Sequence, residues 1–256
     1  SMRINKRIVA FTIADSANLP YANMMIKSLR KFHSAEELTV VIVAGEELDK
    51  RLKDDPAFFY RATPIIASEL FAKGFETVIK ADADQLILGD LNHILDSTGY
   101  DVGTVLNFNR GDFNKYGPIQ VAGIYNTEYY NCGFVVMKNP KFAESWKRLC
   151  FSNHFERYQY REQDLLNFMC FYGEWKVKCF DNFEEGYNAW HGLLSKNEGM
   201  RMKLVDNKII LPAGEEYPTK DVETKLYHWA GEGKAKMNYR ICFPEKIQDF
   251  ITKLIS

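Results

Sequence analysis

The chain has 256 residues, of which 46% are hydrophobic and 14% are aromatic. This is enough to bury a full core within one α/β domain, so we expect residues 1–256 to form a single domain. The 33 basic and 34 acidic residues are interspersed and give a net charge of −1, which excludes a basic face for nucleic acid or anionic lipid.

Membrane segments and disulfides are not indicated either. No apolar run approaches the roughly 20 residues of a membrane span, and the N-terminus lacks the apolar region of a signal peptide. The five cysteines are odd in number and lack Cys-x-x-Cys spacing, so reduced thiols in a reducing compartment fit best. We therefore expect a cytoplasmic protein with no transmembrane segment, whose residues 1–2 are a remnant of tag removal.

Continuous apolar strands alternate with helices in the first third of the chain. This alternation indicates a mostly parallel central sheet flanked by helices, and ligands of such sheets bind beyond the carboxyl ends of the strands. In order, the sequence predicts a strand at 7–13, a turn at 15–18, a helix from Pro20, a strand at 38–43, a helix at 46–53, a strand at 64–67 and a helix at 68–73.

Residues 77–90 differ from this pattern because two carboxylates, Asp82 and Asp84, interrupt an apolar run. In an extended segment residues i and i+2 point to the same side, so both carboxylates can face one bound object. Two close carboxylates repel each other and both stay ionised most easily beside a cation. A divalent metal ion with oxygen ligands is the expected cation, and such an ion usually carries a phosphate. The alternative is a solvated acidic turn. Asp15 lies at the end of another strand, and we expect it to share one crevice with this pair.

The rest of the chain is patterned less regularly. Gly133 suggests a close approach of backbone or ligand within its strand, and the helix from Asp164 should bury Leu165, Phe168, Met169 and Tyr172 on one face. In order, we expect a strand at 102–108, a long loop at 109–130, a strand at 129–139, a helix carrying Phe142 and Trp146, a helix at 164–172, a strand at 175–180, an irregular segment at 181–218, a strand at 225–229, and an amphipathic helix at 244–256 docked on the core.

Five motifs in this order resemble glycosyltransferase family 8, which includes the glycogenin-like enzymes. They are the first strand with its Asp/Asn-rich turn, Asp82-Ala83-Asp84, Asn131-Cys132-Gly133, Glu162-Gln163-Asp164, and His228-Trp229-Ala230-Gly231 with a trailing lysine. The resemblance implies a single Rossmann-like domain of the glycosyltransferase A (GT-A) type. It also implies metal-dependent transfer of a hexose from a UDP-sugar to a saccharide or protein hydroxyl, with retention of anomeric configuration.

The resemblance also implies roles for individual residues. Asp82, Asp84 and His228 would hold Mn²⁺, or Mg²⁺ in its place, and this ligand set fits Mn²⁺ better than Ca²⁺. The remaining roles are contact with uracil for Asp15, Ser16 and Tyr21, contact with the ribose for Asp82, contact with the donor sugar for Asn131, Glu162 and Gln163, and contact with the diphosphate for Gly231 and Lys234.

Three departures from the family pattern stand out. Glu162 replaces an aspartate, and Lys234 is followed by Ala235-Lys236 instead of Pro-Trp, so Lys236 is an alternative diphosphate contact. The family also tends to carry a basic residue about sixteen positions before the Asp-x-Asp, where this chain has Pro64-Ile65-Ile66 and its nearest basic groups are Arg61 and Lys73.

Two other functions stay open at this point. A sugar-nucleotide pyrophosphorylase has a related sheet, although the turn at 15–18 lacks the glycines and basic residues of its phosphate loop. A non-catalytic nucleotide-sugar-binding module would bind the donor without releasing UDP. The sequence does not identify the donor sugar or the acceptor, and it does not show whether the chain forms a homodimer.

Overall fold

The structure, a computed structural model, describes residues 7–107, 124, 128–190, 196–214, 218–229 and 243–256. Nearly all of the loop predicted at 109–130 lies outside these residues. Gly231, Lys234 and Lys236 also lie outside them. The four cysteines in the described part, Cys132, Cys150, Cys170 and Cys179, are free thiols. Among the described residues, no helix is long and apolar enough to cross a membrane.

The central sheet has the strand order β2-β1-β3-β6-β5-β7. Its strands are β1 (Ile8–Ile13), β2 (Thr39–Val43), β3 (Thr77–Ala81), β5 (Val102–Leu106), β6 (Tyr130–Met137) and β7 (Val177–Cys179). β1 runs parallel to β2 and β3, and β5 runs parallel to β7, whereas β6 is antiparallel to both of its neighbours. The predicted mostly parallel sheet is therefore confirmed.

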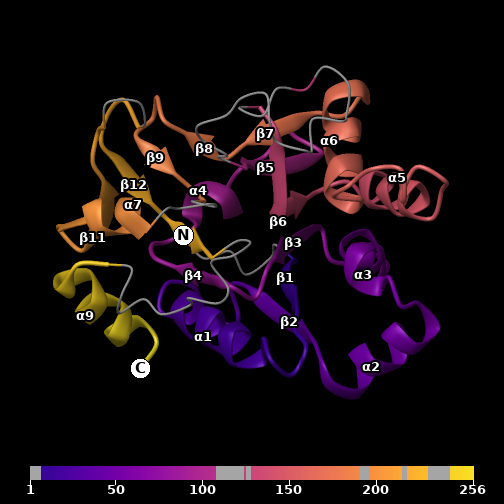
Figure 1. Ribbon diagram of the computed structural model, residues 1–256, viewed down its shortest axis with the longest axis horizontal. Coiled ribbons are helices and arrows are strands. Elements are labelled where there is room, and N and C mark those ends of the chain that lie inside the picture. Colours follow the sequence, from indigo (N-terminus) through magenta and orange to yellow (C-terminus); the bar gives the residue numbers. More distant parts are fainter. Residues whose placement is uncertain (1–6, 108–123, 125–127, 191–195, 215–217, 230–242) are drawn as a thin grey trace.

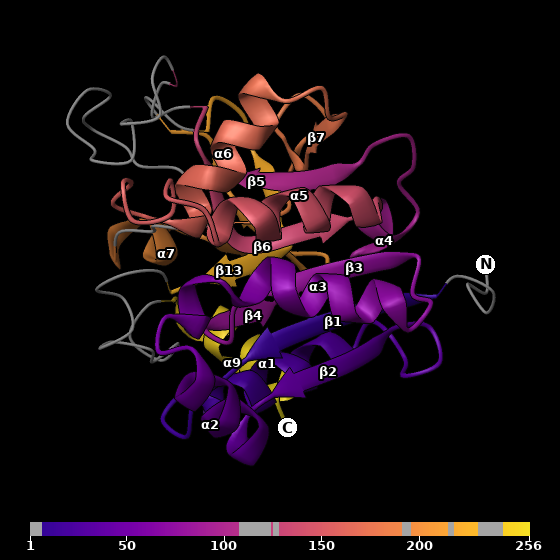
Figure 2. The ribbon, with the colours of Figure 1, turned by 90° about the vertical axis from the view of Figure 1, so that its right-hand side faces the viewer.

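Helices cover both faces of this sheet. Figure 2 shows α3 (Ala62–Ala72), α5 (Pro140–Cys150) and α6 (Glu162–Tyr172) on one face. The opposite face carries α1 (Leu19–Arg30), α4 (Asn92–Leu95) and the β4 (Gln85–Ile87) and β13 (Leu226–His228) ribbon (Figure 1). Successive residues of β1 alternate between two buried clusters, Val9 and Phe11 on the first face, Ile8 and Ala10 on the second. Burial on both faces explains why β1 reads as one continuous apolar run.

A second, smaller sheet lies beside the first and has the order β10-β11-β12-β9-β8. Its elements are β8 (Asp181–Asn182), β9 (Tyr187–Asn188), β10 (Lys203–Val205), β11 (Lys208–Leu211) and β12 (Val222–Thr224), with α7 (Lys196–Arg201) preceding β10. The C-terminal helix α9 (Glu245–Leu254) buries Ile247, Ile251 and Leu254 in the cluster formed with this sheet. The predicted docking of the amphipathic helix is confirmed.

Three local predictions were wrong. The strand expected at 64–67 is part of α3, because Pro64 stands in the first turn, where a helix needs no N–H from it. The segment expected to be irregular, 181–218, holds most of the second sheet, whose strands of two to four residues are too short to show a period. Between these segments and β2, by contrast, the charged helix predicted at 46–53 is confirmed as α2 (Gly45–Asp54), and the 3₁₀ helix η1 (Phe58–Tyr60) follows it.

The third error concerns the buried face of α6. Phe168 and Tyr172 are exposed, whereas Asn167 is fully buried with Leu165 and Met169. Asn167 accepts a hydrogen bond of 2.7 Å from the amide of Tyr130 and donates one of 2.9 Å to the carbonyl of the same residue. This polar contact with the start of β6 sets the rotation of α6, and a hydrophobic period cannot reveal it.

Candidate functional site

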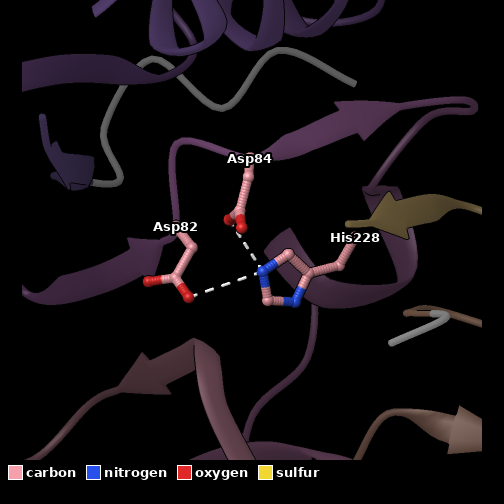
Figure 3. A group of neighbouring side chains, drawn as sticks. All are labelled: Asp82, Asp84 and His228. Carbon is pink, nitrogen blue, oxygen red and sulfur yellow. Dashed lines mark hydrogen bonds and ion pairs between the residues drawn. The ribbon is translucent and has the colours of Figure 1, made fainter. Parts of the chain in front are cut away.

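Two carboxylates and one imidazole meet at the carboxyl end of β3 (Figure 3). Asp82 directly follows β3, Asp84 directly precedes β4, and His228 is the last residue of β13. β4 and β13 pair in antiparallel fashion with His228 opposite Gln85, and the amide of Trp229 donates to the carbonyl of Asp84 at 3.0 Å. Backbone pairing therefore brings together residues that are 144 positions apart.

The geometry of this triad suits a divalent metal ion. His228 Nε2 lies 2.7 Å from Asp84 Oδ1 and 3.5 Å from Asp82 Oδ2, and one ligand atom from each residue lies within 4.8 Å of the others. Neighbouring ligands of an octahedral ion with bonds of about 2.0–2.1 Å are about 2.9 Å apart. The two aspartates face one imidazole, which confirms the prediction that they point to the same side.

His228 is buried and held on one side of its ring. Trp190 packs against the imidazole, with ring centroids 4.9 Å apart. Nε2 faces the two carboxylates, while Nδ1 is buried and has no hydrogen-bond partner among the residues that the structure describes. An imidazole that ligates a metal through Nε2 carries its proton on Nδ1. The ring therefore presents to the carboxylates the nitrogen that can serve as a ligand.

Gly133 allows the backbone of β6 to approach this triad. A Cβ atom at this position would come within 2.8 Å of His228 Cε1 and 2.9 Å of Asp82 Oδ2. The carbonyl of Gly133 also accepts hydrogen bonds from the amide of Asp82 at 2.8 Å and from Gln85 Nε2 at 2.6 Å. The close approach expected at Gly133 is present, and its partners are two residues of the triad.

Lys80 and Glu162 are two buried ionisable residues beside the triad. Lys80 Nζ donates to Asp82 Oδ1 at 2.5 Å and to the carbonyl of Cys132 at 2.8 Å. Burial alone would lower the pKa of Lys80, but the carboxylates of Asp82 and Glu162 and the thiol of Cys132 outweigh burial and raise it. Burial raises the pKa of Glu162 to about 7, against the opposing effect of Lys80.

One oxygen of Glu162 is left for a ligand. Oε2 is buried and has no hydrogen-bond partner among the described residues. The neighbouring Thr63 lowers the pKa of the carboxyl group and so only partly opposes the effect of burial. Glu162 lines a cavity of about 180 Å³ at this end of the sheet. The residues that line this cavity are Ile13, Asn18, Phe59, Thr63, Lys80, Asp82, Ala83, Asp84, Cys132 and Glu162.

The predicted residues Asn131 and Gln163 are held against the backbone of β6. The Asn131 side chain accepts a hydrogen bond of 2.6 Å from the amide of Gly133 and donates one of 2.7 Å to Asn107 Oδ1. Gln163 Oε1 accepts a hydrogen bond of 3.0 Å from the amide of Cys132. Asn131 thus contacts Gly133 itself and Gln163 contacts the preceding residue, so both side chains support the strand that approaches the triad.

The turn after β1 lies at the same end of the sheet. Asp15 Oδ1 accepts hydrogen bonds of 2.8 Å from the amide and from the side chain of Asn18, and Asn18 lines the cavity with Asp82. Ser16 is exposed, and Tyr21 is half-buried in the first turn of α1. Ala83 packs against Ala14 and Ala22, so the Asp-x-Asp turn rests on this segment. The crevice expected between the two strand ends is present, and Asn18, rather than Asp15, lines it.

Sequence reasoning missed two polar residues of the site, Lys80 and Thr63. Lys80 is a charged residue inside the otherwise apolar strand β3, but nothing local in the sequence indicates where its ammonium group points. Thr63 directly precedes the segment that was wrongly predicted as a strand. Arg61, one of the two basic groups considered instead, donates to the carbonyl of Cys150 and to Asp55.

These features define a GT-A fold, the fold of the solved structures that the chain resembles. The galactosyltransferase LgtC, solved in complex with donor and acceptor sugar analogs, matches with a TM-score of 0.53 and 16% identity over 95% of this chain and 100% of that chain. A glycosyltransferase involved in the glycosylation of the major capsid of PBCV-1 matches with a TM-score of 0.56 and 11% identity, over 91% and 98% of the two chains.

Two further glycosyltransferases are longer than this chain. The bifunctional WbbM matches with a TM-score of 0.55 and 14% identity over 100% of this chain and 53% of its own. GlyE of Streptococcus pneumoniae TIGR4 matches with a TM-score of 0.47 and 16% identity over 71% of this chain and 47% of its own. The chain thus matches about half of the length of either protein. No protein-family model and no curated protein sequence matches this chain. At these identities the likeness establishes the fold.

Proposed function

We propose that this protein is a metal-dependent glycosyltransferase of the family 8 type, which transfers a hexose from a UDP-sugar to a hydroxyl of a saccharide or protein and retains the anomeric configuration. The observation that carries this proposal is the convergence of Asp82, Asp84 and His228 at the carboxyl end of β3. Ligands of open α/β sheets bind at this edge, and the GT-A fold supports the same reading.

The three residues of the triad would hold Mn²⁺, or Mg²⁺ in its place. Two carboxylates and one imidazole suit Mn²⁺ better than Ca²⁺, which prefers a larger set of oxygen ligands. A bound divalent ion would supply positive charge to the diphosphate, on which negative charge grows as its bond to the sugar breaks. The chain itself holds the ligands close together beforehand, because Asp84 and His228 are buried and their ligand atoms lie 2.7 Å apart.

Glu162 would bind the donor sugar. Its Oε2 is an acceptor without a partner among the described residues, and its cavity also reaches Asp82 and Asp84. A sugar hydroxyl that donates to this oxygen would satisfy a buried polar atom, which is otherwise costly. Gln163 would lie on the face of the anomeric carbon where the acceptor arrives, and Asn131 would contact the sugar from the β6 side.

The nucleotide would occupy the rest of the crevice. Asp15, Ser16 and Tyr21 would contact uracil from the turn after β1, and Asp82 would also lie near the ribose. Gly231 and Lys234 would contact the diphosphate, with Lys236 as the alternative. They follow His228 by three, six and eight residues, so the chain leads from the third metal ligand directly to them.

UDP release from a panel of UDP-sugars, measured with Mn²⁺ and with a chelator, tests this proposal. Many transferases slowly hydrolyse their donor without an acceptor, so we expect metal-dependent release from one donor, which would identify the sugar. Binding of UDP and Mn²⁺ should raise the melting temperature by a few degrees whether the protein is an enzyme or a binding module. Such stabilisation without UDP release from any donor would therefore favour the non-catalytic binding module. The absence of both UDP release and thermal stabilisation would overturn the proposal.

A further inference from the structure

Lys80 is a charged residue in the middle of the central sheet. It lies on β3 opposite Phe11 of β1 and Val135 of β6, and only 6% of its surface is exposed. A buried ammonium group is costly unless it is paired and hydrogen-bonded. Its partners are Asp82 Oδ1 and the carbonyl of Cys132, so the structure directs Lys80 at one residue of the triad.

The two oxygens of Asp82 face different partners. Oδ1 accepts the hydrogen bond of 2.5 Å from Lys80 Nζ, whereas Oδ2 lies 3.5 Å from His228 Nε2. Oδ2 is also the oxygen that a Cβ atom at Gly133 would approach to 2.9 Å. Lys80 and the glycine backbone together define one orientation of this carboxylate, in which a single oxygen points toward Asp84 and His228.

We propose that Lys80 is a positioning residue that holds Oδ1 of Asp82, so that Asp82 offers only Oδ2 to a metal ion and the site discriminates against Ca²⁺. This inference rests on the proposed function, because it assumes that the triad binds a metal. Ca²⁺ takes six to eight oxygens and often uses a carboxylate through both of them, whereas small octahedral ions accept one oxygen per carboxylate. Engagement of Oδ1 by Lys80 therefore removes one ligand that Ca²⁺ would use.

Lys80→Met tests this inference, because it removes the ammonium group and keeps an unbranched apolar chain of similar length. The affinities of Mn²⁺ and Ca²⁺ are measured by calorimetry on the protein without nucleotide, which gives a readout independent of activity. We expect the preference for Mn²⁺ over Ca²⁺ to fall by about tenfold, the lower end of the range for groups that orient metal ligands. Loss of a positive charge alone would strengthen the binding of both ions alike and leave this ratio unchanged.

A matched control is Lys225→Met. Lys225 is buried to a similar extent and pairs with Glu223 at 3.1 Å and with Asp90 at 3.6 Å, outside the triad. We expect this variant to change stability and not the ratio of the two metal affinities. If Lys80→Met does not fold, Lys80→Gln, which is shorter and uncharged, serves the same comparison.

The possible results separate this inference from the proposed function. Wild-type protein that binds neither ion would overturn both, because no metal site would exist. Wild-type protein that prefers Mn²⁺, with the same preference in folded Lys80→Met, would overturn the role of Lys80 and leave the proposed transferase intact. A reduced preference in Lys80→Met, but not in Lys225→Met, is the result expected.

Discussion

Gly133 and Asp82 lie on adjacent antiparallel segments, and the carbonyl of Gly133 accepts a hydrogen bond of 2.8 Å from the amide of Asp82. The missing side chain of Gly133 leaves the space that Asp82 Oδ2 and the His228 ring occupy. The position of the triad therefore depends on a residue that has no side chain.

Gly133→Ala is expected to displace the triad. The added Cβ atom would lie within 3.0 Å of Asn131 Oδ1, His228 Cε1 and Asp82 Oδ2, distances that real Cβ atoms essentially never show. Because these groups are themselves held by hydrogen bonds, we expect Mn²⁺ affinity to fall at least about tenfold. Calorimetry with Mn²⁺ measures the effect. Gly89→Ala is the control, since its nearest contact would be the flexible Lys225 Cδ at 3.0 Å, and equal losses in both variants would contradict the prediction.

Asp84→Ala is expected to lower turnover by at least roughly 10²-fold, the scale for losing one electrostatic stabiliser of a transition state. Asp84 is 3% exposed and lies 2.7 Å from His228 Nε2, so its removal takes one ligand and frees another. UDP release in the presence of Mn²⁺ measures the change, and circular dichroism checks the fold. Asp90→Ala removes a carboxylate of the same segment outside the triad and should keep its activity. A folded Asp84→Ala protein with near-normal turnover would refute the metal assignment.

Glu162→Gln is expected to weaken the binding of the UDP-sugar and to leave UDP binding unchanged within about twofold. The amide has the size of the carboxyl group, but it replaces one acceptor oxygen by a donor, and a neutral hydrogen bond contributes about 1 kcal/mol. The affinity for UDP-sugar relative to UDP should therefore fall about fivefold in a calorimetric titration with Mn²⁺. Parallel losses for UDP and UDP-sugar would show that Glu162 does not contact the sugar.

Glu162→Asp is expected to change the order of preferred donors. The shorter side chain withdraws the carboxylate from the cavity by about one methylene, which moves its contact to a different sugar hydroxyl. Comparison of UDP release across the donor panel for wild type and variant measures the preference. An unchanged order of donors, with all rates reduced by one common factor, would argue against a role in donor selection.

Asp181 is expected to make the protein less stable as the pH rises from about 4 to about 7. Burial raises the pKa of Asp181 to about 7, and hydrogen bonds from the amides of Leu106 and Trp190 only partly oppose it. An unfolded aspartate titrates near 3.9. Between these values the folded protein binds a proton that the unfolded chain lacks, so the free energy of unfolding falls with rising pH.

Urea unfolding of Asp181→Asn at several pH values between 5 and 8 tests this sign. In this variant the free energy of unfolding should fall less steeply with rising pH than in the wild type. Part of the fall should remain, because burial also raises the pKa of Glu162 to about 7. The double variant with Glu162→Gln should show a still smaller fall. An identical pH dependence in wild type and Asp181→Asn would show that Asp181 stays ionised in the folded protein.

The sequence by itself determined the features that depend on neighbouring residues. Pro20 marked the first turn of α1, the apolar run at β1 indicated a strand buried on both faces, and the period of the last helix indicated its docking through Ile247 and Ile251. The shared direction of Asp82 and Asp84 followed from the geometry of an extended chain. Each of these properties is fixed within about one turn of helix or a few residues of strand.

The family resemblance already implied that His228 and Glu162 belong with the two aspartates, but only the tertiary structure shows which contacts bring these distant residues together. Pairing of β4 with β13 brings His228 to the two aspartates, and the rotation of α6, held by Asn167, directs Glu162 into the cavity beside them. The contacts of Lys80, a charge inside an apolar strand, likewise depend on tertiary structure, because β6 places the carbonyl of Cys132 beside its ammonium group. These relations depend on contacts between segments far apart in the chain, which local periodicity and residue preference do not encode.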